Sequence, residues 1–164
     1  PEVGRRAEAR KLRVVDATCP FVSKVHAEVR RFAASGASVV CIGHRRHEEV
    51  VGVAGEAPEH VRIVESAEEA EALELPGDKP VAVVTQTTLG EAQVASVMAV
   101  LRRRFPTLRM PGSTDVCYAT RNRQRAVSAL AQVCGCSEGA VRVRVHRALR
   151  ALREVFHSPR NSEP

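Results

Sequence analysis

Short runs of β-branched and apolar residues recur along the first hundred residues and predict strands. These runs cover residues 12–15, 38–43, 61–64 and 80–84. Stretches with apolar residues at helical spacing lie between them and predict helices at 21–34, 67–73 and 90–105, with another helix opening after the polar loop at 44–50. Strands that are apolar on both faces and alternate with helices are typical of a parallel sheet covered by helices. The pattern therefore predicts an α/β fold.

The first predicted strand ends at a cysteine that is followed by proline. Pro20 has no N–H to donate and suits the first position of a helix, so the chain should pass from strand to helix at Cys19. Open α/β sheets bind ligands at the carboxyl ends of their strands, and a helix N-terminus favours a thiolate. Cys19 is therefore a candidate metal ligand, although a single cysteine after a strand is more often a small buried hydrophobic residue.

Other polar groups should gather at the same edge of the sheet. Right-handed crossovers place all the strand ends on one side, which brings together Cys19, the loop with His47 and Glu49, and the hydroxyl groups at 85–88. Cys117 ends another strand-like run and also precedes a helix. Two such thiolates could hold an iron–sulfur cluster beside a polar or anionic substrate, and zinc bound by Cys and His is the competing metal.

Composition narrows the class of protein. Hydrophobic residues make up 44% of the 164 residues, but aromatic residues only 3%, so the core of one sizeable or two small domains must consist of Val, Ala and Leu. Five cysteines without paired spacing or a secretory leader predict a reducing compartment, so we expect a cytoplasmic protein. No apolar run approaches the length of a membrane span, so no membrane partner is expected.

The charge is concentrated at one end of the chain. Residues 1–120 hold sixteen Lys or Arg and sixteen Asp or Glu, whereas residues 121–164 hold nine Arg and three Glu, which accounts for the net charge of +6. A helix at 121–132 and a strongly basic helix that ends near Phe156 are predicted there, before a polar, frayed tail at 157–164. This change of character predicts a C-terminal helical extension to the α/β fold.

Four motifs in the sequence resemble those of one enzyme family. They are Asp16-Ala17-Thr18-Cys19-Pro20 with Ser23-Lys24-Val25-His26; Gly43-His44 with His47, Glu49, Val50 and Gly52; Thr85-Gln86-Thr87-Thr88-Leu89; and Asp115-Val116-Cys117-Tyr118-Ala119-Thr120 with Asn122-Arg123-Gln124. In this order and spacing, they make residues 1 to about 131 resemble the 4-hydroxy-3-methylbut-2-enyl diphosphate reductases, the last enzymes of the non-mevalonate isoprenoid route.

The resemblance implies a fold, a cofactor and a reaction. The family has three similar α/β domains around a central 4Fe-4S cluster, and each domain contributes one cysteine. It reduces an allylic alcohol diphosphate to isopentenyl and dimethylallyl diphosphate, removing the hydroxyl with two electrons from a ferredoxin- or flavodoxin-type donor and with protons. By resemblance, Cys19 and Cys117 are two of the three cluster thiolates, and one iron position stays open for the substrate oxygen.

The resemblance also implies roles for three polar residues. His47 would bind the diphosphate, and Glu49 would protonate the leaving hydroxyl with Thr87 hydrogen-bonded in the relay. Hydroxide is a poor leaving group, so a carboxyl group that protonates the hydroxyl would help the C–O bond to break. Two positions depart from the family pattern: Glu48 stands where proline is usual, and Arg121 stands where a small hydroxyl residue is usual.

The same resemblance divides the chain into four parts. Residues 1–11 are expected to be a helical remnant of a preceding domain, 12–112 the central α/β domain, 113–131 the start of a third α/β domain, and 132–164 a basic helical segment. The family's first cysteine and two phosphate-binding histidines belong to an N-terminal domain that this chain is expected to lack, together with most of the third domain. A cluster with two thiolates is labile, so we expect the chain to fold its central sheet without catalysing the reaction.

The last quarter of the sequence resembles the final helix-turn-helix of extracytoplasmic-function sigma factors. Gly135 suits the turn and Ser137 suits an N-cap. Arg142, Arg144 and Arg147 on the next helix could meet DNA phosphates or bases. Only the second half of the motif matches, so weak, non-specific DNA binding is expected. The alternatives to an incomplete reductase are a DNA-binding module on an α/β platform and a non-functional product of a chimeric gene.

Overall fold

The computed structural model describes residues 2–112 and 115–156 of the chain. Its elements, in chain order, are α1 (Glu2–Ala9), α2 (Pro20–Ala34), β1 (Ser38–Ile42), α3 (Glu48–Glu56), β2 (Val61–Val64), α4 (Ala67–Ala72), β3 (Val81–Thr85), α5 (Glu91–Arg104), α6 (Tyr118–Val133) and α7 (Glu138–Phe156). The chain divides into two compact units, Pro1–Thr120 and Arg121–Pro164.

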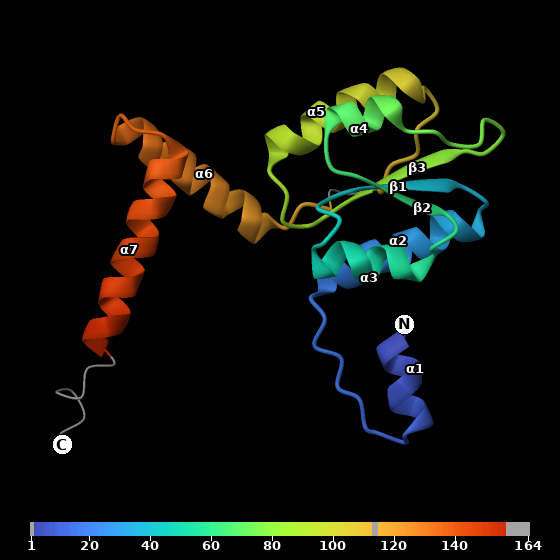
Figure 1. Ribbon diagram of the computed structural model, residues 1–164, viewed down its shortest axis with the longest axis horizontal. Coiled ribbons are helices and arrows are strands. Elements are labelled where there is room, and N and C mark those ends of the chain that lie inside the picture. Colours follow the sequence, from blue (N-terminus) through green and yellow to red (C-terminus); the bar gives the residue numbers. More distant parts are fainter. Residues whose placement is uncertain (1, 113–114, 157–164) are drawn as a thin grey trace. The chain divides into compact units, whose positions relative to one another are not determined.

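Three parallel strands form one sheet in the first unit. Their order is β2-β1-β3, so β1 is central, and Val39 of β1 lies beside Val61 of β2 and Ala82 of β3. Helices α2 and α3 cover one face of the sheet, and α4 and α5 cover the other (Figure 1). The predicted parallel sheet covered by helices is therefore confirmed.

Alternate residues of β1 face opposite layers of the core. Val39 and Cys41 belong to the cluster that also holds the apolar faces of α2 and α3. Val40 and Ile42 belong to the cluster with α5, where Leu101 is fully buried. Valine predominates in both layers, and burying each Val or Leu side chain stabilises the fold by about 1.5–3 kcal/mol. The five residues of β1 are buried without exception, as the run of apolar residues predicted.

The strand predicted at 12–15 is wrong. These residues form no regular structure and are exposed, and Val15 is 81% exposed. The outer edge of β3 is already occupied by the backbone of Arg109, which donates to the Val81 carbonyl (2.8 Å) and accepts from the Val83 N–H (2.9 Å). A short apolar run therefore finds no hydrogen-bonding partner there. The described residues hold three β–α units instead of the four predicted, and Cys19 does not follow a strand.

The helices follow their predictions closely. Helix α2 begins at Pro20, as expected, and Cys19 is its N-cap residue, without a capping bond from the side chain. Val25, Val29 and Phe32 of α2 are buried at helical spacing. Helices α4 and α5 lie within two residues of the ranges expected from periodicity. None of the described helices is long and apolar enough to cross a membrane.

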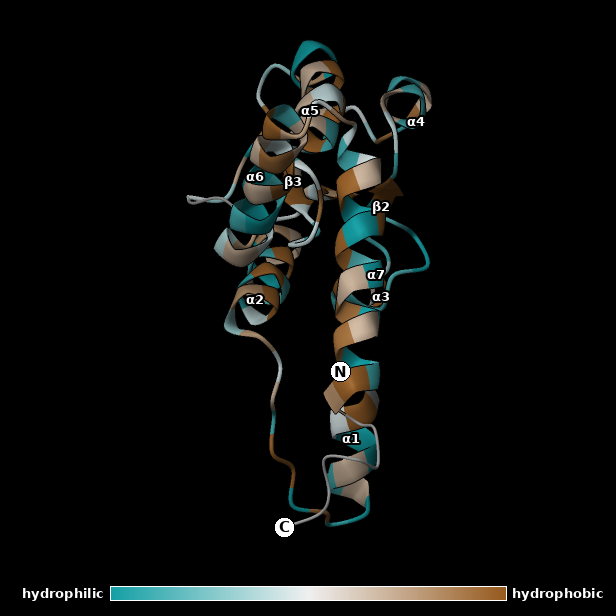
Figure 2. Ribbon diagram, turned by 90° about the vertical axis from the view of Figure 1, so that its left-hand side faces the viewer, coloured by the Kyte–Doolittle hydropathy of each residue, from teal (hydrophilic) through white to brown (hydrophobic). Residues whose placement is uncertain are grey.

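The second unit is a pair of helices joined by a short turn (Figure 1). Gly135 in the turn has a φ of +58°, a left-handed value that glycine adopts without strain. Ser137 caps α7 as predicted, because its Oγ accepts a hydrogen bond from Ala140 N (3.2 Å). Hydrophobic and hydrophilic residues are interleaved along α7 (Figure 2). Helix α6 supplies a helix before the turn, although only the part after it matched the sigma-factor pattern.

The predicted four-part division of the chain stays a prediction. Its boundary after residue 112 adjoins residues 113 and 114, which lie outside the described residues together with the expected tail at 157–164.

Candidate functional site

The loop after β1 turns into α3 at a histidine. His47 is the N-cap residue of α3, and its Nδ1 accepts a hydrogen bond from Glu49 N (3.2 Å). Because Nδ1 is an acceptor, the neutral imidazole carries its proton on Nε2, which is left to donate to another group. The bond closes the first turn of α3 and fixes His47 and Glu49 relative to each other.

Glu49 and Thr87 form the best-defined polar pair of the first unit. Oε1 of Glu49 accepts from Thr87 N (2.7 Å), and Oε2 accepts from Thr87 Oγ1 (3.0 Å). Thr87 is buried, whereas Glu49 is half-buried. The two residues are far apart in sequence and meet because parallel strands end at the same edge of the sheet. Two of the predicted site residues are therefore in direct contact.

Gln86 holds this edge together, and sequence reasoning assigned it no role. Its backbone N–H donates to the Ile42 carbonyl (2.8 Å), and its side-chain Oε1 accepts from His44 N (2.9 Å). Its Nε2 donates to Thr88 Oγ1 (2.7 Å). The side chain thus joins the loop after β1 to the turn after β3. The only signal in the sequence was its place within the Thr85–Leu89 motif.

The segment that carries Cys117 is fastened to the same edge. Asp115 is buried, and its Oδ2 accepts from Thr85 N (3.1 Å) while its Oδ1 accepts from Lys24 Nζ (2.9 Å). Two residues later, Cys117 N donates to the Thr87 carbonyl (2.9 Å). Thr87 therefore contacts Glu49 on one side and Cys117 on the other. Sequence reasoning gave no role to Asp115 or Lys24, although both lie within the quoted motifs.

Cys19 and Cys117 each stand immediately before a helix. Cys19 precedes α2 on an exposed segment, and the half-buried Cys117 precedes α6. The first turns of these helices meet through Phe21 and Tyr118, whose ring centroids lie 6.1 Å apart at an interplanar angle of 57°. The two predicted thiol ligands therefore flank one aromatic contact. Before Cys19, a hydrogen bond from Thr18 N to Asp16 Oδ1 (2.9 Å) closes a turn.

The donor set fits a metal cluster only in part. Among residues 2–112 and 115–156, no group of three or more His, Cys, Asp or Glu side chains is arranged to hold a metal ion. Clusters of the 4Fe-4S type are usually held by four thiolates. Cys41 is fully buried in the core layer with α2 and α3, and burial, followed by the charges of Glu49 and Asp115, raises its pKa to about 12. The described residues thus supply two candidate thiolates and not a complete ligand set.

Charged side chains hold the loop after β1 against the segment before α4. Arg45 pairs with Glu69 (2.8 Å), and its backbone N–H donates to Glu65 Oε1 (3.1 Å). The bond from Arg45 N is the main cause that lowers the pKa of Glu65, and a contact from His44 also favours the carboxylate. These contacts join the loop that carries His47 to Glu65 and to Glu69 of α4.

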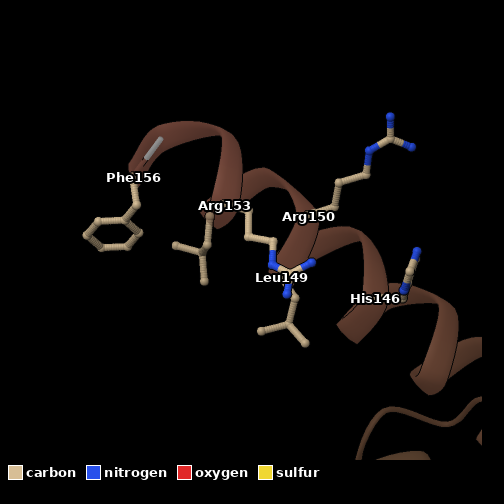
Figure 3. A pocket seen from close by; sticks show the side chains of 6 residues that line it. His146, Leu149, Arg150, Arg153 and Phe156 are labelled. Carbon is tan, nitrogen blue, oxygen red and sulfur yellow. The ribbon is translucent and has the colours of Figure 1, made fainter. Parts of the chain in front are cut away.

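The predicted nucleic-acid contacts lie on α7 in the second unit. Arg142 pairs with Glu138 one turn earlier (3.1 Å), and Arg144 lies 3.9 Å from Cys136 Sγ. Arg147 is exposed. A shallow hollow of about 610 Å³ lies further along the same helix, lined by His146, Leu149, Arg150, Leu152, Arg153 and Phe156 (Figure 3). The hollow contains none of the predicted site residues.

Comparisons with known proteins agree with the four motifs. The family model described as "LytB protein" matches residues 1–136. The 4-hydroxy-3-methylbut-2-enyl diphosphate reductase of Acidothermus cellulolyticus is 49% identical over 133 residues, which cover 81% of this chain and 39% of that protein. A reductase of the same name, number 2 of Mycobacterium bovis, is 50% identical over 134 residues, covering 82% of this chain and 41% of the relative.

A solved structure is similar over the same region. The E-1-hydroxy-2-methyl-but-2-enyl-4-diphosphate reductase from Plasmodium falciparum superposes with a TM-score of 0.77 at 37% identity, covering 80% of this chain and 42% of that one. The chain spans about 40% of the length of these relatives. A family model that matches residues 1–136, taken with the sheet and motifs above, shows that this chain belongs to the LytB protein family.

Proposed function

We propose that this chain forms part of the active site of a 4-hydroxy-3-methylbut-2-enyl diphosphate reductase of the non-mevalonate isoprenoid pathway. The observation that carries the proposal is the double hydrogen bond from Thr87 to the Glu49 carboxylate, beside a backbone bond from Cys117 to the same threonine. It is supported by the similarity to reductases of that name. Because the chain spans less than half of those proteins, the remaining groups of the site would come from residues outside this chain.

The proposed reaction removes a hydroxyl group from an allylic alcohol diphosphate. The C–O bond breaks, the oxygen leaves as water, and two electrons and a second proton give isopentenyl or dimethylallyl diphosphate. Hydroxide is a poor leaving group, so a positioned acid that protonates it is typically worth about 10²–10⁴-fold in rate. Glu49 would be that acid. Both groups of Thr87 donate to Glu49, so they stabilise the carboxylate that remains after the proton has left.

His47 would bind the diphosphate of the substrate, and the two thiols would bind the cluster. The Nε2–H of His47 would donate to a diphosphate oxygen, since Nδ1 is already used as an acceptor from Glu49 N. Cys19 and Cys117 would be two of the thiolate ligands of a 4Fe-4S cluster. When bound, that cluster would supply the electrons, which a ferredoxin- or flavodoxin-type protein would deliver. The described residues would supply the proposed proton donor with its Thr87 partner, and they would supply only part of the cluster's ligand set.

The proposal is tested by replacing the carboxyl group of Glu49 without changing its shape. In a full-length reductase that carries this segment in place of its own, Glu49→Gln should keep the cluster spectrum and lose about 10²–10⁴-fold in turnover. Glu59→Gln, which changes an exposed carboxyl group outside the site, is the matched control and should leave turnover unchanged. The assay is reduction of the allylic diphosphate with a chemical electron donor. A near-normal rate in Glu49→Gln would refute the role.

The isolated chain provides a second measurement. After anaerobic treatment with iron and sulfide, we expect it to fold its sheet but to give no useful turnover. Each missing charge-assisted contact to a phosphate costs about 1.5–3 kcal/mol, so the loss of several abolishes useful affinity. Turnover comparable to that of a full-length reductase would contradict this expectation and would mean that copies of the chain complete the site together.

A second candidate function is DNA binding by the second unit, and the α6–turn–α7 geometry favours it. A glycine-containing turn of three or four residues between two helices is the geometry of helix-turn-helix motifs. The turn here spans residues 134–137 with Gly135 in the left-handed region, and α7 presents Arg142, Arg144 and Arg147. The resemblance to sigma-factor sequences points the same way. Phosphate contacts would dominate such binding, so its affinity would fall steeply with salt.

Fluorescence anisotropy with a labelled duplex tests this candidate across a salt titration. Arg147→Ala should weaken binding to all sequences alike and reduce the salt slope by about one. Arg13→Ala removes the same charge from an exposed position in the other unit and is the matched control. Identical behaviour of the two variants, or no binding at low salt, would remove the candidate. A sequence-specific complex that survives high salt would contradict weak, phosphate-dominated binding and would show that the second unit recognises bases.

A further inference from the structure

A buried carboxylate outside the proposed catalytic pair joins three segments of the first unit. The side chain of Asp115 is 2% exposed, and its two oxygens contact Lys24 Nζ on α2 (2.9 Å) and Thr85 N at the end of β3 (3.1 Å). Burying a carboxylate is costly unless it is paired and hydrogen-bonded. Both oxygens of Asp115 have such partners, and neither partner belongs to the groups proposed to touch substrate.

The ammonium group of Lys24 contacts two carboxyl groups, those of Asp115 and Glu28. Its Nζ also lies 3.7 Å from Glu28 Oε1, one turn along α2. The pKa of Glu28 is raised, first by burial and then by repulsion from the neighbouring Asp115 carboxylate. Glu28 and Asp115 both lie near the Lys24 ammonium group. Removing Lys24 would therefore take away the ammonium group that pairs with the buried Asp115 carboxylate. The Lys24–Asp115 contact (2.9 Å) is shorter than the Lys24–Glu28 contact (3.7 Å), so Asp115 is the closer of these two partners of the ammonium group.

The contact fixes the direction of the segment that leads to Cys117. Asp115 is bonded to Thr85, and Cys117 is bonded to Thr87, so residues 115–117 run beside residues 85–87 with a bond at each end. Thr87 in turn donates twice to Glu49. A shift of Asp115 would therefore be transmitted to Cys117 and, through Thr87, to the proton donor.

We propose that the Lys24–Asp115 ion pair is a positioning device that sets Cys117 beside the Glu49–Thr87 pair. The proposal rests on the proposed function, which gives Cys117 and Glu49 their roles. Neither Lys24 nor Asp115 touches the reacting atoms. Lys24 extends to Asp115 from α2, the helix that begins directly after Cys19. The ion pair therefore connects the two segments that carry the candidate thiols.

The test uses the 164-residue chain itself, without cluster or substrate. Lys24→Met removes the ammonium group and keeps the length of the side chain, and Asp115→Asn removes the charge and keeps the shape. Lys24→Arg restores the charge. Arg30→Met is the matched control, because Arg30 also extends from α2 to a carboxylate, Glu56 (2.8 Å), away from this site.

Two readouts follow Cys117 directly. The first is hydrogen exchange of the Cys117 amide, which is bonded to the Thr87 carbonyl, and the second is the rate of Cys117 alkylation by iodoacetamide. Losing a charged hydrogen bond should speed both by about 10- to 150-fold in Lys24→Met and Asp115→Asn. Lys24→Arg and Arg30→Met should leave both rates near the wild-type values. Amide exchange in β1 should change little in all four variants.

Three results would overturn the proposal. The first is that the Cys117 rates are unchanged in both charge-removing variants. The second is an equal acceleration at the β1 amides, which would mean a general loss of stability, and the third is that Lys24→Arg fails to restore the protection of Cys117. None of these readouts involves turnover. Their failure is therefore distinguishable from failure of the proposed function, which depends on the rate of Glu49→Gln.

Discussion

Gly43 stands where the end of β1 meets the proposed site, and adding one methyl group there should disturb both. An ideal Cβ at this position would lie 2.6 Å from Val50 Cγ2, 3.0 Å from Gln86 Cβ and 3.1 Å from Gln86 Oε1. Val50 is fully buried and cannot move outward. Gln86 can move only by giving up its hydrogen bond from His44 N (2.9 Å).

The expected cost of Gly43→Ala combines these two effects. Adding volume to a packed core costs about 1–3 kcal/mol, and a lost hydrogen bond costs about 0.5–1.5 kcal/mol, so we expect about 1.5–4.5 kcal/mol of destabilisation. Gly55→Ala is the matched control, because it lies in α3 and its Cβ would meet nothing within 4 Å. A glycine replaced by alanine in a helix should stabilise by about 0.5–1 kcal/mol.

Amide exchange of β1 measures the outcome. The chain has no tryptophan, and a signal averaged over both units would not isolate the first one, whereas the β1 amides exchange when the central sheet opens. Each 1.4 kcal/mol corresponds to about tenfold in the exchange rate, so Gly43→Ala should accelerate it by about 10- to 1,600-fold and Gly55→Ala should slow it. Equal rates in the two variants would refute the packing argument.

Two further predictions follow from the titratable groups. Burial raises the pKa of Cys41 to about 12, so at pH 8 the native chain should be alkylated at the exposed Cys19 but not at Cys41, as mapped by peptide mass spectrometry; modification of both at equal rates would contradict the buried position. Burial acts to raise the pKa of Glu56, but hydrogen bonds from Arg30 and His26 outweigh it and hold the pKa below 4.5. The stability that Glu56 contributes is present above that pH and is lost as the pH falls through its folded-state pKa, so Glu56→Gln should flatten the unfolding free energy measured between about pH 5 and 3.

The pattern of apolar residues predicted most of the fold because continuous apolar runs form the buried strands and apolar residues at helical spacing form the buried faces of the helices. The run that forms β1 is buried at every position, and α2 buries Val25, Val29 and Phe32 at helical spacing. The exception at 12–15 has the same local composition as a strand. The edge of β3 is occupied by the backbone at Arg109, and the run does not pair with β2 at the other edge of the sheet. Pairing is a long-range property that a four-residue pattern does not contain.

The sequence predicted those residues of the candidate site that a family motif assigns a role. It did not predict the residues whose role depends on long-range hydrogen bonds. Glu49 and Thr87 were chosen by resemblance, and the structure brings them together across 38 residues of sequence. Gln86 and Asp115 lie in the same motifs, but their importance arises from bonds to His44, Thr85 and Lys24. Those partners lie 42, 30 and 91 residues away, and nothing local in the sequence indicates the pairing.

The proposed proton donor and the candidate thiol ligands differ in how firmly the fold holds them before any ligand binds. Glu49 is held at the start of α3 by two bonds from Thr87, and Thr87 follows a buried strand, so this pair is ordered together with the sheet. Cys19 lies at the end of an exposed segment that belongs to no strand. Cys19 itself is the N-cap residue of α2, but residues 12–18 before it are exposed and belong to no helix or strand. Ordering a residue costs about 1–2 kcal/mol of backbone entropy, so a ligand that also fixes this segment must supply this free energy, whereas one that meets Glu49 need not. Assembly of the proposed cluster should therefore be the step most sensitive to changes before Pro20, while Glu49 keeps its position without any ligand.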